Sequence, residues 1–106
     1  MGKEGCAVEK ALDAIGGKWN TLVIRDLLSG RKRFTELQDS LGVSSKVLTS
    51  TLKHLDKNKV ILRNVEPTTP PSVYYELSEY GFKLKSVIES LELWGSIEPP
   101  TVSPNS

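Results

Sequence analysis

The side chains that could do chemistry are mainly lysines, arginines and short hydroxyls, and they gather in the middle of the chain. The 106 residues carry a formal net charge of +1. Residues 16–64, however, contain ten Lys or Arg and four Asp or Glu, a net of +6, while the remainder contains four bases and nine acids, a net of −5. A basic middle between acidic ends predicts an anionic partner for the middle alone.

Residues 44–57 carry these groups on one face of an expected helix that begins after a Ser44 cap. Hydroxyls can bond base edges or phosphates, and lysine can reach a guanine edge or a phosphate. The first half of such a helix would meet bases, and Lys53 would meet the backbone. A solvated face is the alternative for any amphipathic helix. The predicted DNA-binding residues of this segment are Ser44, Ser45, Lys46, Thr49, Ser50 and Lys53.

A second cationic group lies just upstream of this helix. Three adjacent bases repel one another unless an anion or solvent compensates, so phosphate contact and a solvated loop are both reasonable there. Arg63, on a later strand, could enter a groove or pair with Glu76. The predicted phosphate or wing contacts are Arg31, Lys32, Arg33, Thr35 and Arg63.

The sequence lacks the parts of a catalytic site. It contains one Cys and one His, Cys6 and His54, separated by most of the basic segment, and no acid–base pair is evident. It has no CxxC or HExxH motif and no glycine-rich phosphate loop, so we expect no catalytic residue, no metal and no cofactor. His54 lies beside an apolar stripe, which favours packing or a phosphate contact. The sequence predicts that the protein is not an enzyme.

Two expected helices, 35–41 and 44–57, are separated by a short turn that contains Gly42, which is the spacing of a helix-turn-helix. Thr35 and Gln38 fit a capping box at the start of the first. Leu48, Thr51, Leu52 and Leu55 gather on the expected buried side of the second.

The segment 61–66, a loop over 67–72 and the segment 73–77 then predict a β-hairpin. The expected fold class is therefore mainly α with a two-stranded β-wing (α+β), a winged helix-turn-helix.

The first and last helices are expected to be amphipathic. The first spans about 8–15, and the last begins after Ser78 and carries an apolar stripe larger than a small monomer readily covers. The alternative is that this stripe only closes the monomer core. The predicted dimer contacts are Val8, Leu12, Leu84, Val87, Ile88, Leu91 and Trp94.

We expect a single domain over residues 1–98 and a flexible proline-containing tail over 99–106. No segment is long and apolar enough to cross a membrane, and one cysteine cannot form an internal disulfide. We therefore expect a cytoplasmic protein.

Six short motifs occur in one order between Cys6 and Gly95, and their combination is specific: Cys6-Ala7-Val8-Glu9, Ile15-Gly16-Gly17-Lys18-Trp19, Arg33-Phe34-Thr35-Glu36-Leu37, Leu52-Lys53-His54-Leu55, Tyr75-Glu76-Leu77-Ser78 and Tyr80-Gly81. Through this combination of motifs, the chain resembles the HxlR family of bacterial regulators. The resemblance implies a winged helix related to MarR-type repressors, dimeric through its N-terminal and C-terminal helices.

The resemblance also implies a role for Cys6. In several members of this family a cysteine near this position senses oxidants or electrophiles. The positive end of a helix stabilises a thiolate, the reactive form; Lys3 and Lys10 would assist, while Glu4 and Glu9 would oppose. The alternative is an inert, small apolar residue at the dimer edge.

The predicted function is a bacterial homodimer that binds an inverted repeat in double-stranded DNA and represses by occupying a promoter. The effector is unknown; an oxidant or electrophile is one candidate. The alternative is a winged helix used only for protein–protein assembly. Binding to DNA that weakens steeply with salt would favour the regulator.

Overall fold

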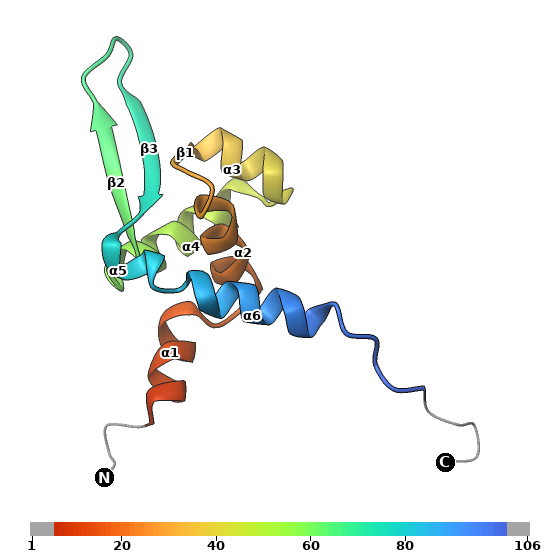
Figure 1. The fold of residues 1–106 in the computed structure, drawn as a ribbon. Coiled ribbons are helices and arrows are strands. Elements are labelled where there is room, and N and C mark those ends of the chain that lie inside the picture. Colours follow the sequence, from red (N-terminus) through yellow and green to blue (C-terminus); the bar gives the residue numbers. More distant parts are fainter. Residues whose placement is uncertain (1–5, 102–106) are drawn as a thin grey trace.

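The computed structural model describes residues 6–101. Its elements follow one another as six helices and three strands within this range (Figure 1). In order they are α1 (Ala7–Ile15), α2 (Lys18–Leu27), β1 (Lys32–Arg33), α3 (Phe34–Leu41), α4 (Ser45–Lys57), β2 (Ile61–Glu66), β3 (Ser72–Leu77), α5 (Glu79–Phe82) and α6 (Lys85–Gly95). The domain prediction of 1–98 and the tail prediction of 99–106 extend over residues 1–5 and 102–106, which lie outside the described residues.

The core forms where α2, α3 and α4 pack on the base of the β2–β3 hairpin. Ile24, Leu27, Leu37 and Leu55 are completely buried. Figure 1 shows the hairpin projecting upward from this body, α1 projecting below it and α6 extending to one side. The predicted inner side of α4 is confirmed, because its buried residues are Leu48, Thr51, Leu52 and Leu55.

The turn between α3 and α4 is fixed by local chemistry. Gly42 adopts a left-handed conformation (φ +61°), and its N–H donates to the Gln38 carbonyl at 2.8 Å, which ends α3. Ser44 then caps α4, since its Oγ accepts from the Val47 N–H at 3.2 Å. The predicted Ser44 cap is therefore confirmed.

The predicted Thr35–Gln38 capping box is wrong. Arg33 is the N-cap of α3, and its N–H donates to Glu36 Oε1 at 2.8 Å. The reason is that β1 keeps the chain extended through Arg33, so the helix begins immediately afterwards at Phe34. Gln38 instead donates from Nε2 to Ser45 Oγ at 2.8 Å, joining α3 to α4.

The sheet has three antiparallel strands in the order β1-β3-β2, one more than predicted. The additional strand is two residues long, with Lys32 opposite Tyr75 and Arg33 opposite Tyr74. The hairpin pairs Ile61 with Leu77 at its base, and β3 begins at Ser72, one residue earlier than expected. This strand pairing fixes the segment before α3 to the wing.

The predicted single C-terminal helix is divided in two. Ser78 caps α5 as expected, its Oγ accepting from the Gly81 N–H at 2.9 Å. The N–H groups of Lys83 and Leu84 then donate to carbonyls three residues back, at 3.2 and 3.0 Å. Such a tighter turn redirects the chain before α6 begins.

The division places Ile88 in the monomer core, where it is 2% exposed. The prediction that Ile88 forms part of a dimer interface is therefore wrong. Leu84 is half-buried and packs against the same core.

We predict that Gly81→Ala destabilises the fold by about 1–3 kcal/mol. A Cβ at this position would lie 2.1 Å from the Val60 carbonyl oxygen. That oxygen accepts hydrogen bonds from the N–H and the Oγ of Ser78, both at 3.0 Å, so it is not free to move away. Chemical denaturation measures the change. Gly95→Ala is the control, because a Cβ there meets no atom within 4 Å. Equal unfolding midpoints for the two variants would contradict this account.

Candidate nucleic-acid interface

The exposed side of α4 brings together most of the predicted DNA-binding residues. Lys46, Thr49, Ser50 and Lys53 are all exposed. Their position follows from helical spacing, because the leucines of the same helix are buried on its other side. Ser50 Oγ donates to the Val47 carbonyl of its own helix at 3.3 Å, so this hydroxyl has a local partner in the unbound protein. This face combines cations and hydroxyls suited to base edges and phosphates.

Ser45 has a structural role in addition to the predicted one. It is exposed at the first position of α4 and accepts the hydrogen bond from Gln38 Nε2. A hydroxyl that accepts one bond can still donate its own proton. The Gln38–Ser45 contact therefore joins α3 to the start of α4 without removing the Ser45 donor.

His54 binds α1 to α4. Its Nε2 lies 3.0 Å from the carbonyl oxygens of both Asp13 and Ala14 at the end of α1. Carbonyl oxygens can only accept, so these two contacts form when Nε2 carries the proton; Asn58 Nδ2, which lies 3.4 Å from the same nitrogen, donates to the His54 carbonyl at 2.9 Å. Of the two roles predicted for His54, the structure supports packing rather than a phosphate contact.

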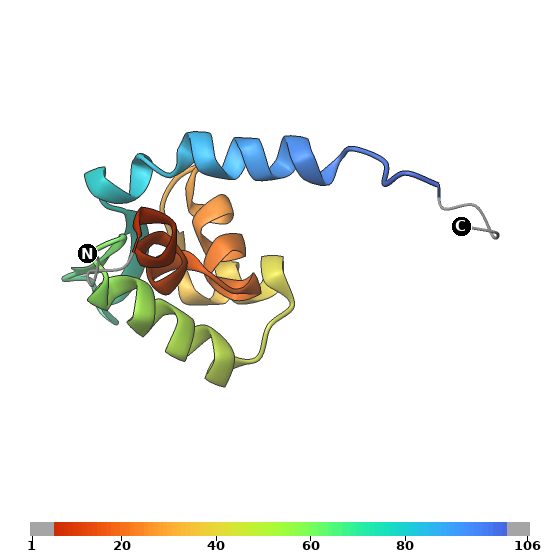
Figure 2. The same cartoon turned by 90° about the horizontal axis from the view of Figure 1, so that it is seen from below.

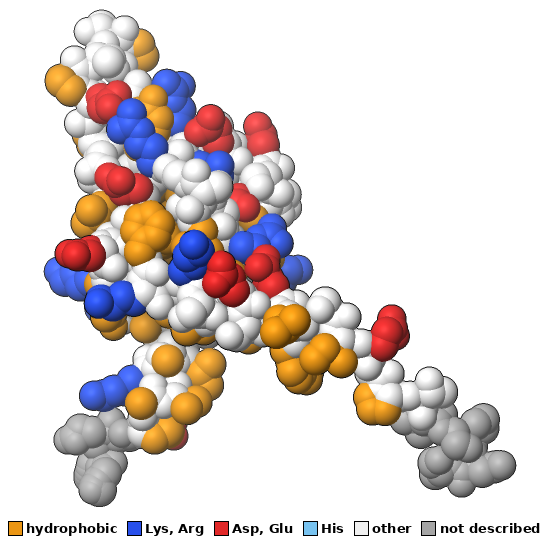
Figure 3. Space-filling model, viewed as in Figure 1, with side chains coloured by type: hydrophobic (Ala, Val, Ile, Leu, Met, Phe, Trp, Pro, Cys, Tyr) orange, Lys and Arg blue, Asp and Glu red, His pale blue; other side chains and the backbone are white. Residues whose placement is uncertain are grey.

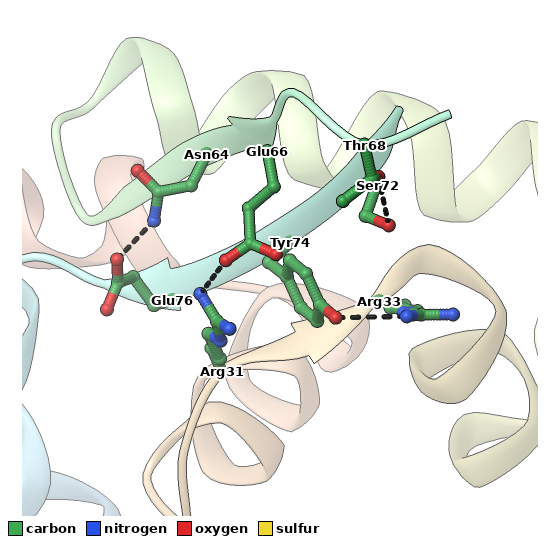
Figure 4. A network of polar contacts seen from close by, with 8 residues as sticks. All are labelled: Arg31, Arg33, Asn64, Glu66, Thr68, Ser72, Tyr74 and Glu76. Atoms are coloured by element: carbon green, nitrogen blue, oxygen red, sulfur yellow. Dashed lines mark hydrogen bonds and ion pairs between the residues drawn. The ribbon is translucent and has the colours of Figure 1, made fainter. Parts of the chain in front are cut away.

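The predicted cationic group at 31–33 lies against the wing, where Tyr74 is its main partner (Figure 4). The Arg31 guanidinium lies 4.0 Å from the centre of the Tyr74 ring, and Arg31 Nη1 lies 3.0 Å from Glu66 Oε2. Arg33 Nη2 donates to the Tyr74 hydroxyl at 3.0 Å. Cation–π contacts and a charge-assisted hydrogen bond thus hold both arginines on one face of the hairpin.

The Tyr74 contacts also affect the charge of Arg33. The hydrogen bond to the Tyr74 hydroxyl, followed by the charge of that group, raises the pKa of Arg33 above its ordinary value. Arg33 is therefore cationic at neutral pH, as arginine ordinarily is. Nothing in the sequence spacing indicated Tyr74 or Glu66 as partners, because they lie about 40 residues away and meet the arginines only through the pairing of β1 with β3.

Arg63 lies on the other face of the hairpin. The predicted pairing of Arg63 with Glu76 is wrong, because Glu76 accepts a hydrogen bond from the Asn64 side chain instead. Arg63 lines a cleft of about 270 Å³ between the wing and α4. The other lining residues are Phe34, Thr49, Leu52, Lys53, Asp56 and Tyr75. Thr35 is exposed in the first turn of α3 but does not line this cleft.

The first and last helices expose apolar side chains that the described residues 6–101 do not cover (Figure 3). Ile15 is the one residue of α1 that is buried, and Ile88 is the one in α6. Val8 is 66% exposed and Trp94 is 76% exposed. The sequence analysis missed several members of this surface; the exposed apolar residues of the two ends are Val8, Leu12, Tyr80, Phe82, Val87, Leu91, Leu93, Trp94 and Ile97.

Cys6 is the exposed N-cap of α1. Its Sγ accepts from the Glu9 N–H at 3.4 Å, and its N–H donates to Glu9 Oε1 at 3.2 Å. The expected position at a helix start is therefore confirmed. An exposed sulfur at this position is open to reagents in solution.

Residues 6–101 show neither a metal site nor a membrane helix. No group of three or more His, Cys, Asp or Glu side chains in this range could hold a metal ion. No helix of the same range has both the length and the apolar character needed to span a bilayer.

Comparison with known proteins agrees with this geometry. A family model for the HxlR-like helix-turn-helix matches residues 14–101. The HTH-type transcriptional regulator YodB of Bacillus subtilis (strain 168) is 38% identical over 96 residues, covering 89% of this chain and 86% of YodB. The reduced form of YodB superposes with a TM-score of 0.79 at 36% identity, covering 92% of this chain and 99% of that one.

Two further solved structures share the fold. The redox regulator HypR in its oxidized form has a TM-score of 0.83 at 32% identity and covers 91% of this chain and 100% of its own. A transcriptional regulator of the MarR family from Porphyromonas gingivalis W83 has a TM-score of 0.84 at 30% identity, with coverages of 93% and 98%. The predicted winged helix-turn-helix fold and its relation to MarR-type proteins are confirmed.

Proposed function

Because the chain belongs to the HxlR-like helix-turn-helix family, a family of DNA-binding transcriptional regulators and not of enzymes, we propose that it recognises a specific operator in bacterial DNA. The observation that carries this proposal is the exposed face of α4, where Lys46, Thr49 and Ser50 stand on the first half of a helix held at its N-terminus by Gln38 and Ser45. In helix-turn-helix proteins this half of the recognition helix contacts base edges in the major groove.

The active species in this proposal is a homodimer formed through α1 and α6. A short amphipathic helix that buries one side chain gains little from its own chain, so it needs a second surface to be stable. Both helices carry large exposed apolar side chains, Leu12 and Trp94 among them. A second copy offers the same apolar surface, and a two-fold axis makes one patch complementary to itself.

The exposed face of α4 and the apolar surface of α6 point in different directions. In Figure 2, α4 and α6 lie on opposite sides of the body. A dimer joined through α1 and α6 therefore leaves both copies of α4 uncovered. Two recognition helices spaced by about 34 Å would enter successive major grooves over an inverted repeat. Occupying a promoter in this way would exclude the transcription machinery, so we propose repression.

A thiol signal through Cys6 is the second part of the proposal. Cys6 is exposed at the start of α1. The similar proteins include one described as a redox regulator, HypR, and one solved after diamide treatment, YodB. Because the chain has a single cysteine, its oxidation to a disulfide must use a thiol of another molecule, and an oxidant such as diamide accepts the two electrons and the two thiol protons. A quinone would instead form a thioether with the thiolate.

We predict that Lys46→Ala and Thr49→Ala reduce sequence discrimination by about 1–3 kcal/mol, because each removes a contact to base edges. Arg33→Ala weakens binding to all sequences alike, since it lies on the wing face and not on the base-reading side of α4. Fluorescence anisotropy on an operator selected from a random library, with random DNA as competitor, measures both effects. Equal losses on specific and random DNA for all three variants would contradict these roles. If none of the proteins binds DNA even at low ionic strength, the result would favour the alternative of a winged helix used only for protein–protein assembly.

We predict that Leu91→Glu converts the dimer to a monomer at micromolar concentration, because it places a charge on an apolar interface. Leu91 is exposed, so the variant leaves the monomer core intact. Light scattering after size-exclusion chromatography measures the mass. Leu62→Glu is the control, since Leu62 is similarly exposed but lies on the wing. A monomeric wild type, or an unchanged dimer in Leu91→Glu, would count against the proposed interface.

We predict that diamide or a quinone abolishes specific DNA binding by the wild type and leaves Cys6→Ser bound, because Cys6 is the one thiol in the chain. A gel shift with excess random DNA, before and after treatment, measures this. The expected affinity loss is at least tenfold. If the treatment leaves DNA binding by the wild type unchanged, Cys6 is not the sensor, but the proposal that the protein is a DNA-binding regulator stands.

A further inference from the structure

The cleft between α4 and the wing collects cations from two different elements. Thr49, Lys53 and Asp56 follow one another at intervals of four and three residues, so they form one stripe along α4 beside the buried leucines. Arg63 comes from β2 and lines the same cleft. A helix and a sheet therefore present charged side chains to one shared space of about 270 Å³.

The sheet holds Arg63 at a defined height above the core. Side chains alternate along a strand, so Arg63 is on the same face as Ile61, which is buried opposite Leu77. Arg63 and its partner Tyr75 form the next pair on that face, about 7 Å farther out. The buried Ile61–Leu77 pair thus fixes where the arginine leaves the sheet.

The two cations of the cleft have no anionic partner in the described residues 6–101. Lys53 and Arg63 are both exposed, and neither forms an ion pair there, even with Asp56 in the same cleft. The wing's own carboxylates are on the opposite face, where Glu66 binds Arg31. Two unpaired cations against one carboxylate leave the cleft with a positive charge that suits an anion.

We propose that this cleft holds one phosphate of the DNA backbone between Lys53 and Arg63, an inference that rests on the proposed function. When α4 enters a major groove and the wing approaches the neighbouring minor groove, the strand between the grooves passes through the space between helix and wing. The phosphate would then fix the distance of α4 from the DNA axis while Lys46 and Ser50 contact bases.

The test is a scan of the selected operator in which one phosphate at a time is replaced by an uncharged methylphosphonate. Neutralising the phosphate held in the cleft lowers wild-type affinity about tenfold. Lys53→Met and Arg63→Met each bind more weakly, and each loses part of the sensitivity to replacement of that same phosphate, whereas the double variant is insensitive to it. Lys85→Met, which removes an exposed charge at the start of α6, keeps the wild-type pattern. Asp56→Asn binds all duplexes more tightly, since it removes the carboxylate.

The outcomes separate the two proposals. If the sensitivity of Lys53→Met and Arg63→Met falls at two different phosphates, or at none, the shared site is overturned, while wild-type binding keeps the proposed function. Absence of wild-type binding to any duplex at low salt overturns both. Thermal unfolding of each variant confirms that the exposed substitutions leave the fold intact.

Discussion

The burial of one side of α4 determines the direction in which the other side points. Leu48, Leu52 and Leu55 are buried against the body, and a buried leucine contributes about 1.5–3 kcal/mol. The Gln38–Ser45 hydrogen bond contributes nearer 1 kcal/mol. Packing therefore sets the orientation of the helix, and the hydrogen bond adjusts its start. Rotation by one residue, about 100°, would expose leucines and bury lysines, so the cationic face is a direct consequence of the core.

The two faces of the hairpin carry different sets of side chains, because side chains alternate between the faces along each strand. Ile61, Arg63 and Tyr75 are on the face toward α4, whereas Asn64, Glu66 and Tyr74 are on the opposite face, where Arg31 and Arg33 contact the last two. An exposed ion pair such as Arg31–Glu66 adds at most about 1 kcal/mol, so the network on the outer face sets the angle of the wing more than it stabilises the fold. By engaging the carboxylate of Glu66 on that face, the sheet keeps it away from the cleft.

Much of this arrangement could be predicted from local patterns. The predictions that were wrong depend on contacts between residues far apart in the sequence. The inner stripe of α4, the Ser44 cap and the hairpin each depend on residues close in sequence. By contrast, β1 is two residues long and shows no period, and its pairing with β3 moved the start of α3 from Thr35 to Phe34. Ile88 and Leu91 belong to the same apolar stripe, yet one is buried and the other exposed, because α6 extends beyond the body that covers its beginning. Periodicity identifies an apolar side but not what covers it.

Contacts of α1 define a physical route from the thiol to the recognition helix. Cys6 begins α1, and the carbonyls of Asp13 and Ala14 near its other end accept from His54 of α4. A helix of this length spans about 13 Å and moves as a rigid rod. Because α1 buries little on its own chain, its position in the proposed dimer depends on the partner and on the chemistry at Cys6. Any displacement of α1 must either stretch the His54 contacts or move α4 with it. If Cys6 responds as proposed, the contacts of His54 with α1 provide one route by which a change at the N-terminus of α1 would reach α4.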